Sequence, residues 1–324
     1  MPYLTTIGEL LIDFTPSGEN SQGMALFARN PGGGVANVAA MFAKLGGQAS
    51  FLGKVGKDDF GSFLLNTMQS SNVDCQGLIE DPEALTTLAF VQLDEKGDRS
   101  FTFYRKPGAD LLLRPEEICY DRIDRCQVFH FGAVSLTDEP SRSATFSAAA
   151  YAKEAGKLIS FDPNYRPFLW PNPEQAKEQM EKGAALADLL KVSEEEMTLL
   201  TGQQELAAGS ERLLSMGPSL VLVSLGAQGA FFRTRQAMGR MATYDVPTVD
   251  TTGAGDAFVG SMLLQLAHLS PGELGGLDEQ SLREMVDFAN AAGSLTTTRK
   301  GAIPAMPTRE EIQQCRASAS LLDG

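Results

Sequence analysis

Short apolar runs alternate with amphipathic runs of helix length along most of this 324-residue chain. Residues 158–162 and then 173–186 form one such pair, and residues 189–192 and then 194–200 form the next. Strands that are buried on both faces and separated by helices are typical of a parallel sheet covered on both sides. We therefore expect an α/β fold with a doubly wound, mainly parallel sheet, whose ligands bind beyond the carboxyl ends of the strands.

The alternation continues through the rest of the chain, so we expect a single domain over residues 1–324. Residues 3–12 are expected to form one strand that Gly8 breaks, and residues 35–45 an Ala-rich helix. Further strands are predicted at 49–52, 128–134 and 220–224, and further helices at 60–70, 141–155, 205–216, 254–269 and 282–296.

One region breaks this rhythm. Residues 87–93 and 100–104 alternate apolar and polar side chains, and the turn-rich run Asp94-Glu-Lys-Gly-Asp98 lies between them. This pattern is typical of a β-hairpin with one solvated face. Together, residues 11–30 and 85–110 are predicted to form a small discontinuous sheet that closes over a cleft as a lid.

The formal net charge of −14 argues against two classes of partner. An acidic surface repels nucleic acid and anionic membranes, so neither is expected to bind. No apolar run approaches the roughly 20 residues that span a bilayer, and no basic signal-peptide start is present, so we expect a cytoplasmic protein. The four cysteines contain no C-x-x-C pair and are expected to be reduced thiols.

The run Val249-Asp-Thr-Thr-Gly-Ala-Gly-Asp256 leads into the expected helix at 254–269. The first N–H groups of a helix are unpaired and lie at the positive end of its dipole, so Gly253, Ala254 and Gly255 can form an anion site. Asp256, in the first turn, can accept the proton of a hydroxyl that attacks phosphorus. The alternative is that Asp256 only stabilises the helix N-terminus.

This run resembles the C-terminal signature of the ribokinase-like, or PfkB, carbohydrate kinase family, and the likeness extends over nearly the whole chain. The resemblance implies a ribokinase-like fold in which the small sheet is the lid. It also implies that Asp256 is the catalytic base, that Gly253 to Gly255 form an anion hole, and that ATP with Mg²⁺ is the phosphoryl donor.

A second glycine-rich run, Asn30-Pro-Gly-Gly-Gly-Val-Ala-Asn37, is similar to the family's N-terminal signature. The similarity implies that Gly33, Gly34 and Asn37 bind the sugar, and the Asn37 amide has the donors and acceptors that a polyol requires. The family also places a sugar-binding aspartate where Asp13 follows the first strand. The alternatives are a polar helix residue at Asn37 and a capping residue at Asp13.

Alternate residues of a strand point to one face, so Phe101, Phe103 and Arg105 are expected to share the face that closes over the sugar. The alternative is that the phenylalanines pack a dimer or the base of the lid.

The run that ends at Asp110 and the run Phe161-Asp-Pro-Asn-Tyr-Arg166 closely resemble the fructokinase group of the family. This resemblance implies that Arg166 contacts the sugar or the transferred phosphate. The alternative for Arg166 is a structural ion pair.

The nucleotide end is predicted from three further likenesses. The run Lys191-Val-Ser-Glu-Glu-Glu196 matches the family's N-x-x-E motif, with serine in place of the usual asparagine. The match implies that Glu196 acts on magnesium and phosphate through water, while Ser193 also has the spacing of a helix cap. The run Val223-Ser-Leu-Gly-Ala-Gln-Gly229 resembles the family's nucleotide loop, and Asn290 lies where the family lines the adenine pocket. The alternative for Asn290 is a polar residue on a helix face. The residues implied to border the nucleotide are Ser193, Glu196, Ser224, Gly226, Gly229, Gly253, Gly255 and Asn290.

Many family members hold a monovalent cation beside the anion hole, and the resemblance implies a potassium site here. Its oxygens would be largely backbone carbonyls. By position, they belong to Asp250, Thr252, Thr296, Arg299 and Gly301.

These inferences predict ATP-dependent phosphorylation of fructose at O6. The alternatives are another sugar kinase of the family, acting on 2-keto-3-deoxygluconate, ribose or a nucleoside, and a catalytically silent sugar-binding protein. The intact Asp256 and its glycines argue against the silent protein. The resemblance also implies a homodimer formed through the lid sheets.

Overall fold

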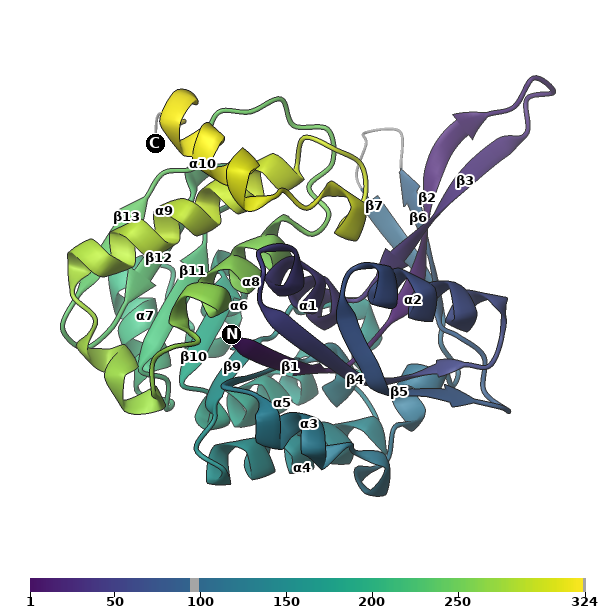
Figure 1. Cartoon of the computed structure of the whole chain (residues 1–324), viewed down its shortest axis with the longest axis horizontal. Helices are drawn as coiled ribbons and strands as arrows, with labels where there is room; N and C mark the ends of the chain where they lie inside the picture. The colour runs from purple at the N-terminus through teal and green to yellow at the C-terminus, as the bar shows by residue number, and fades with distance from the viewer. Residues whose placement is uncertain (94–98, 323–324) are drawn as a thin grey trace.

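The computed structural model describes residues 1–93 and 99–322, without the side chains of residues 92, 93 and 99–101. The turn predicted at 94–98 lies outside the described residues. The described strands form two sheets, and helices cover both faces of the larger one (Figure 1).

Nine strands of the described chain form the large sheet, in the order β13-β12-β11-β10-β9-β8-β1-β4-β5. The pairs from β5 to β11 are parallel, whereas β12 and β13 pair antiparallel at one edge. The strands are β1 (Tyr3–Ile7), β4 (Gln48–Gly56), β5 (Val73–Asp81), β8 (Val128–Gly132), β9 (Leu158–Asp162), β10 (Leu189–Ser193), β11 (Leu220–Ser224), β12 (Ala230–Arg233) and β13 (Met238–Met241).

Alternate residues of the central strands pack into two cores, one on each face of the large sheet. On β8, Val128 belongs to one core while Phe129 and Phe131 belong to the other. Burial of each such side chain contributes about 1.5–3 kcal/mol.

The first core is shared with α1, α2, α8, α9 and α10, and the second with α3 to α7. The helices are α1 (Gly34–Lys44), α2 (Asp59–Ser70), α3 (Tyr120–Arg125), α4 (Ser141–Glu154), α5 (Pro173–Leu186), α6 (Glu194–Thr201), α7 (Leu206–Leu214), α8 (Ala254–Leu266), α9 (Glu279–Thr296) and α10 (Arg309–Ser318). This confirms the doubly wound α/β prediction. Among the described residues, no helix combines the length and apolar character needed to span a membrane.

The second sheet has the order β3-β2-β6-β7 and contains β2 (Leu11–Glu19), β3 (Ala25–Gly32), β6 (Leu88–Leu93) and β7 (Arg99–Tyr104). Strands β2 and β6 pair parallel, and the other two pairs are antiparallel. The β2–β3 pair projects from the body of the molecule (Figure 1). The small sheet is therefore confirmed, and its closure as a lid stays a prediction.

The single strand predicted at residues 3–12 is wrong, because the chain divides there between the two sheets. Gly8 has φ 152°, and a Cβ on it would lie 2.8 Å from Val35 Cγ2, so a larger residue would be strained at this bend. The bend carries β2 away from the large sheet and over the carboxyl end of β1. Sequence reasoning also missed β5, β12, β13, α3 and α10.

The strand order places a functional site at one point of the large sheet. From β1 the chain builds β4 and β5 on one side, and later β8 to β11 on the other. In open α/β sheets, ligands bind beyond the carboxyl ends of the strands where the order reverses. The small sheet and the N-termini of α1 and α8 lie at this end.

Candidate active site

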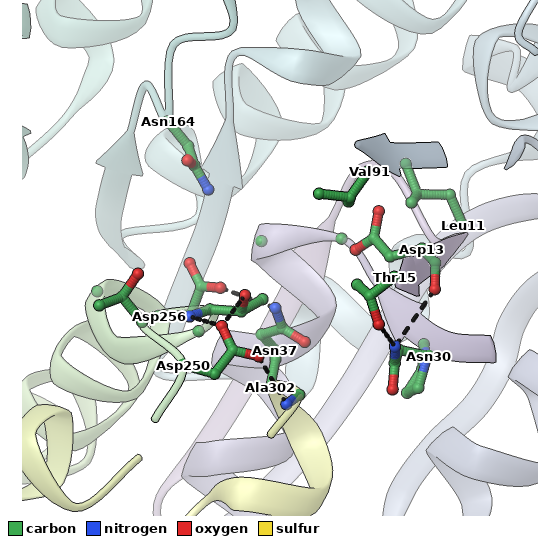
Figure 2. Close-up of a pocket in the computed structure, with 18 of the residues that line it drawn as sticks. Leu11, Asp13, Thr15, Asn30, Asn37, Val91, Asn164, Asp250, Asp256 and Ala302 are labelled. Atoms are coloured by element: carbon green, nitrogen blue, oxygen red, sulfur yellow. Dashed lines mark hydrogen bonds between the residues drawn. The ribbon is translucent and has the colours of Figure 1, made fainter. Parts of the chain in front are cut away.

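A cavity of about 470 Å³ lies between the reversal point of the large sheet and the small sheet. Figure 2 shows Asp13, Thr15 and Asn30 on one side of it and Asn37, Asp250 and Asp256 on the other. Most of the residues predicted for the sugar and the phosphoryl group line this cavity: Asp13, Gly33, Gly34, Asn37, Phe103, Arg166, Gly253, Gly255 and Asp256. Three of the residues predicted for the cation, Asp250, Thr252 and Gly301, line it as well.

Asp256 lies in the first turn of α8, directly after the glycine turn. Gly253 is the N-cap at φ 80°, and a Cβ there would lie 2.6 Å from the Ala302 side chain. The Asp256 carboxylate accepts a 2.7 Å hydrogen bond from Nδ2 of Asn37 on α1. The helix N-terminus and the carboxylate thus meet at the cavity wall, as the motif predicts for an anion site beside a base.

Burial raises the pKa of Asp256 to about 6, above its ordinary value of 3.8. The Asn37 hydrogen bond opposes this rise, the nearby Asp162 carboxylate adds to it, and Lys191 and Arg166 reduce it. A carboxylate with a pKa near neutrality can take a proton from a hydroxyl more readily than an ordinary aspartate can.

Asp13 on β2 lines the opposite wall of the cavity. Burial raises its pKa to about 6, and the Arg166 guanidinium limits that rise. A Cβ on Gly32 would lie 2.2 Å from Asp13 Oδ2, so the glycine leaves the space that this carboxylate occupies. Two carboxylates on opposite walls suit a ligand that presents several hydroxyl groups.

The glycine loop before α1 lies close to the neighbouring backbone. Gly33 has φ 119°, and a Cβ on it would lie 2.4 Å from the Glu9 carbonyl oxygen. The Gly34 N–H donates a 2.8 Å hydrogen bond to Oε1 of Glu9. Only glycine fits here without displacing the strand-end backbone that forms the cavity floor.

Two buried acceptors at the cavity have no hydrogen-bond partner among the described residues: Oδ1 of Asn37 and Oε2 of Glu9. An unpaired buried acceptor costs about 1–3 kcal/mol, which a ligand hydroxyl can recover. Burial also raises the pKa of Glu9 to about 7. Sequence reasoning missed Glu9, although its position in the same run as Asp13 was a usable signal.

Asn164 was also missed, and its backbone is the signal that identifies it. Its φ is 45°, in the left-handed region that non-glycine residues rarely adopt, and its N–H donates to Asp162 Oδ1 at 3.0 Å. Figure 2 shows its side chain pointing toward the cavity, which it lines.

The structure places Arg105 away from the cavity wall. Its guanidinium donates to Asp110 Oδ2 at 2.8 Å, to Thr137 Oγ1 at 2.9 Å and to the Val134 carbonyl at 3.1 Å. Both Arg105 and Asp110 are buried, so this arginine joins the end of β7 to the segment that follows β8. Its expected face-sharing with the phenylalanines is not what the structure shows, because β7 ends at Tyr104.

Phe101 and Phe103 are the two phenylalanines of β7 that were predicted to face the sugar. Phe103 lines the cavity, and its ring centroid is 5.3 Å from that of Phe168. The side chain of Phe101 lies outside the described part of the structure.

Two cations line the cavity near Asp256. Nη1 of Arg166 donates to the carbonyl oxygens of Asn164 at 3.3 Å and Tyr165 at 3.2 Å. Lys191, for which no role was predicted from the sequence, has its Nζ 3.0 Å from Oδ2 of Asp162. Both place positive charge near the N-terminus of α8.

Ser193 caps α6, and its hydroxyl accepts from the Glu196 N–H at 3.2 Å. The Glu196 carboxylate accepts from the Ser193 N–H at 2.6 Å and from the Tyr165 N–H at 2.6 Å. The predicted cap is confirmed. Each Glu196 oxygen keeps a second lone pair, which fits a role through water.

The other predicted nucleotide residues lie at the end of β11 and on α9. The chain turns tightly just beyond Ser224, where Gly226 and Gly229 have positive φ angles of 57° and 90°. Asn290 donates to the carbonyl oxygens of Met241 at 3.2 Å and Ala242 at 3.0 Å. Contact of these residues with a nucleotide stays a prediction.

Asp250 joins the two loops of the predicted cation site. Its Oδ1 accepts from the Thr252 N–H at 3.0 Å, and its Oδ2 accepts from the Gly301 N–H at 3.0 Å. The Thr296 hydroxyl donates to the Ala292 carbonyl, and the Arg299 side chain pairs with Glu311. The loops are thus held together by groups other than the carbonyls expected to bind the ion.

A helix N-terminus, an adjacent buried carboxylate and facing hydrogen-bond acceptors are typical of an enzyme that transfers a phosphoryl group to a small hydroxylated molecule. The family model described as pfkB family carbohydrate kinase matches residues 1–309, and the chain belongs to this family.

Several relatives of this chain within the family are named fructokinases. The chain is 44% identical over 319 residues to a fructokinase-1 of Oryza sativa subsp. japonica, with 98% of each chain covered. A structure of fructokinase from Xylella fastidiosa with bound ATP superposes with a TM-score of 0.89 at 37% identity, over 97% of both chains. A double mutant of the Vibrio cholerae O395 fructokinase, with fructose, ADP and potassium ion bound, has a TM-score of 0.86 at 37% identity, over 97% of this chain and 98% of that one.

Proposed function

We propose that this protein is an ATP-dependent fructokinase that phosphorylates fructose at O6. The observation that carries the proposal is the Asn37 amide. Its Nδ2 is bonded to Asp256, while its buried Oδ1 has no partner among the described residues. A sugar hydroxyl bonded to Oδ1 would therefore lie beside the proposed base. The relatives above supply the identity of the sugar.

In the reaction, Asp256 accepts the proton of the O6 hydroxyl as that oxygen attacks the γ-phosphorus of ATP. The O6–P bond forms, the bond from phosphorus to the bridging oxygen breaks, and ADP leaves with that electron pair. The N–H groups of Ala254 and Gly255 face the charge that develops on the transferred group. Closure of the small sheet would exclude water, so that water could not replace the sugar hydroxyl as the nucleophile that attacks phosphorus.

Metal ions have proposed places at the site. Mg²⁺ bound with the nucleotide would neutralise phosphate charge, and Glu196 would act on the ion through water. A potassium ion at the loops joined by Asp250 would add positive charge beside α8, and its support is the potassium bound to the Vibrio cholerae relative.

The outer face of the small sheet is the proposed homodimer surface. The rings of Phe14 and Phe90 stack at 4.8 Å between centroids, and Phe27 and Tyr104 pack against Phe90. Phe27 is 43% exposed and Tyr104 64% exposed, so an apolar surface remains for a partner.

The cysteines Cys75, Cys119, Cys126 and Cys315 are free thiols, which supports the proposed cytoplasmic location.

A coupled assay over fructose, ribose, 2-keto-3-deoxygluconate and adenosine tests the choice of sugar. We expect the highest kcat/KM for fructose, and ³¹P NMR of the product should identify the 6-phosphate. A higher kcat/KM for ribose or adenosine would reject fructose as the substrate. The Asp256→Asn variant is the control, because it should lose activity toward every sugar of the panel.

A further inference from the structure

Lys191 is a buried cation at the phosphoryl end of the cavity. It lies on β10, its side chain is 9% exposed, and it lines the cavity with Gly253, Gly255 and Asp256. Its Nζ is 3.0 Å from Oδ2 of Asp162, at the end of β9.

The ammonium group faces the same space as the N-terminus of α8. A Cβ built on Gly255 would lie 3.5 Å from Nζ, and no atom outside the adjoining turns of the helix is nearer to that position among the described residues. The free N–H groups of the helix and a full positive charge therefore border one volume. A phosphoryl group that occupies this volume would contact both.

The charges around the cavity explain why a cation is needed there. The chain has a net charge of −14, and Asp13 and Asp256 both lie in the cavity wall. A triphosphate that approaches these carboxylates is repelled unless positive charge is concentrated locally. Lys191 carries that charge: burial opposes it, but Asp162 and Glu196 outweigh burial and raise the pKa of Lys191.

The ion pair with Asp162 leaves the ammonium with donors to spare. An ammonium has three N–H donors, and among the described residues Asp162 is the one side chain in an ion pair with it. Asp162 also accepts the Asn164 N–H, so its carboxylate is fixed by the backbone. A buried ion pair alone is weak evidence for a role in stability.

We propose that Lys191 is a further catalytic residue, whose ammonium binds the transferred phosphoryl group in the transition state while Asp162 holds it in position. Lys191 stays protonated throughout, since the proton of the sugar hydroxyl goes to Asp256. The inference rests on the proposed phosphoryl transfer but not on the identity of the sugar.

Two variants that break the same ion pair test it: Lys191→Met removes the cation, and Asp162→Asn keeps it. We expect Lys191→Met to lower kcat about 10²-fold, the effect of removing one transition-state donor. Asp162→Asn should lower kcat less than about tenfold, because the ammonium remains. Equal losses in both variants would show that the pair is only structural and overturn the proposal.

Binding provides a readout besides turnover. Calorimetric dissociation constants of Lys191→Met for ADP and for the sugar should stay within about threefold of wild type, because neither ligand carries the transferred group. A loss of sugar or ADP affinity that matches the loss in kcat would contradict the proposal.

A matched control is Lys54→Met, which removes another buried lysine, paired with Glu117 at 2.7 Å and outside the cavity. It should reduce stability to urea while kcat stays near wild type. If Lys191→Met does not fold, Lys191→Arg decides: retention of at least about a tenth of kcat supports the need for a cation, and inactivity of the folded variant overturns the assignment. If the wild-type protein phosphorylates no sugar, the proposed function fails, which is distinct from a failure of the Lys191 assignment.

Discussion

The acid limb of the pH profile should report the raised pKa of Asp256. The base must be ionised to accept the hydroxyl proton, so turnover falls as pH drops through its pKa. Burial sets that pKa at about 6 instead of the ordinary 3.8. The perturbation is a change in pH from 8 to 5, followed through kcat/KM for the sugar, because kcat/KM reports the pKa of the enzyme before the sugar binds.

The two pKa values give different outcomes. With a pKa of about 6, roughly one Asp256 carboxylate in eleven is ionised at pH 5, so kcat/KM should fall at least about tenfold. With the ordinary value, more than about nine in ten remain ionised and Asp256 would cause little change in kcat/KM. The Asn37 hydrogen bond lowers the pKa of Asp256, so Asn37→Ala should move the limb to higher pH.

The assay couples ADP release to NADH oxidation, with the coupling enzymes shown to be in excess at every pH. Circular dichroism at pH 5 establishes that the protein remains folded. A kcat/KM that is constant from pH 8 to 5, or a limb that Asn37→Ala leaves in place, would refute Asp256 as the base with a raised pKa.

Three further predictions concern stability. The raised pKa of Asp256 means that its ionised carboxylate destabilises the folded state once the pH exceeds about 6, whereas the protonated carboxyl near pH 4 does not. Asp256→Asn, which cannot ionise, should therefore be about 1–3 kcal/mol more stable than wild type at pH 8 and similar to it at pH 4, as measured by urea unfolding. Gly33 has φ 119°, and an alanine Cβ there would lie 2.4 Å from the Glu9 carbonyl oxygen, so Gly33→Ala should lower the free energy of unfolding by at least about 1–3 kcal/mol and raise the KM for sugar. Gly46→Ala is the control, because Gly46 also has a positive φ but a Cβ there would meet no close contact. Arg105→Ala leaves Asp110 buried without its cation and should cost about 3–5 kcal/mol, with a smaller loss for the double variant Arg105→Ala, Asp110→Ala; a thermal melt unchanged by the single variant would contradict this.

Local rules made the class of fold and the phosphoryl end of the site predictable. Strand and helix periods are properties of neighbouring residues, so β9, β11 and α5 have the predicted bounds. The glycine turn before Asp256 needs only a positive φ and a following helix, which the run itself specifies.

The lid region was predictable in outline but not in detail. The alternation at 87–93 indicated β6, whereas the break at Gly8 was read as an interruption of one strand, because periodicity cannot show that the two halves enter different sheets. Arg105 was expected at the sugar by its place in a run, yet its charge is satisfied by Asp110 in the interior.

The sequence by itself determined the α/β class, and it identified a candidate anion site at the start of α8 and Asp256 as the candidate base. Only the tertiary structure brought Asn37 to Asp256 across 219 positions, Lys191 to Asp162, and Gly34 to Glu9. The physical reason is that periodicity specifies which face of an element is buried but not its partner. Strand order and packing choose the partner, and with it the pKa of the base and the acceptors left for the sugar.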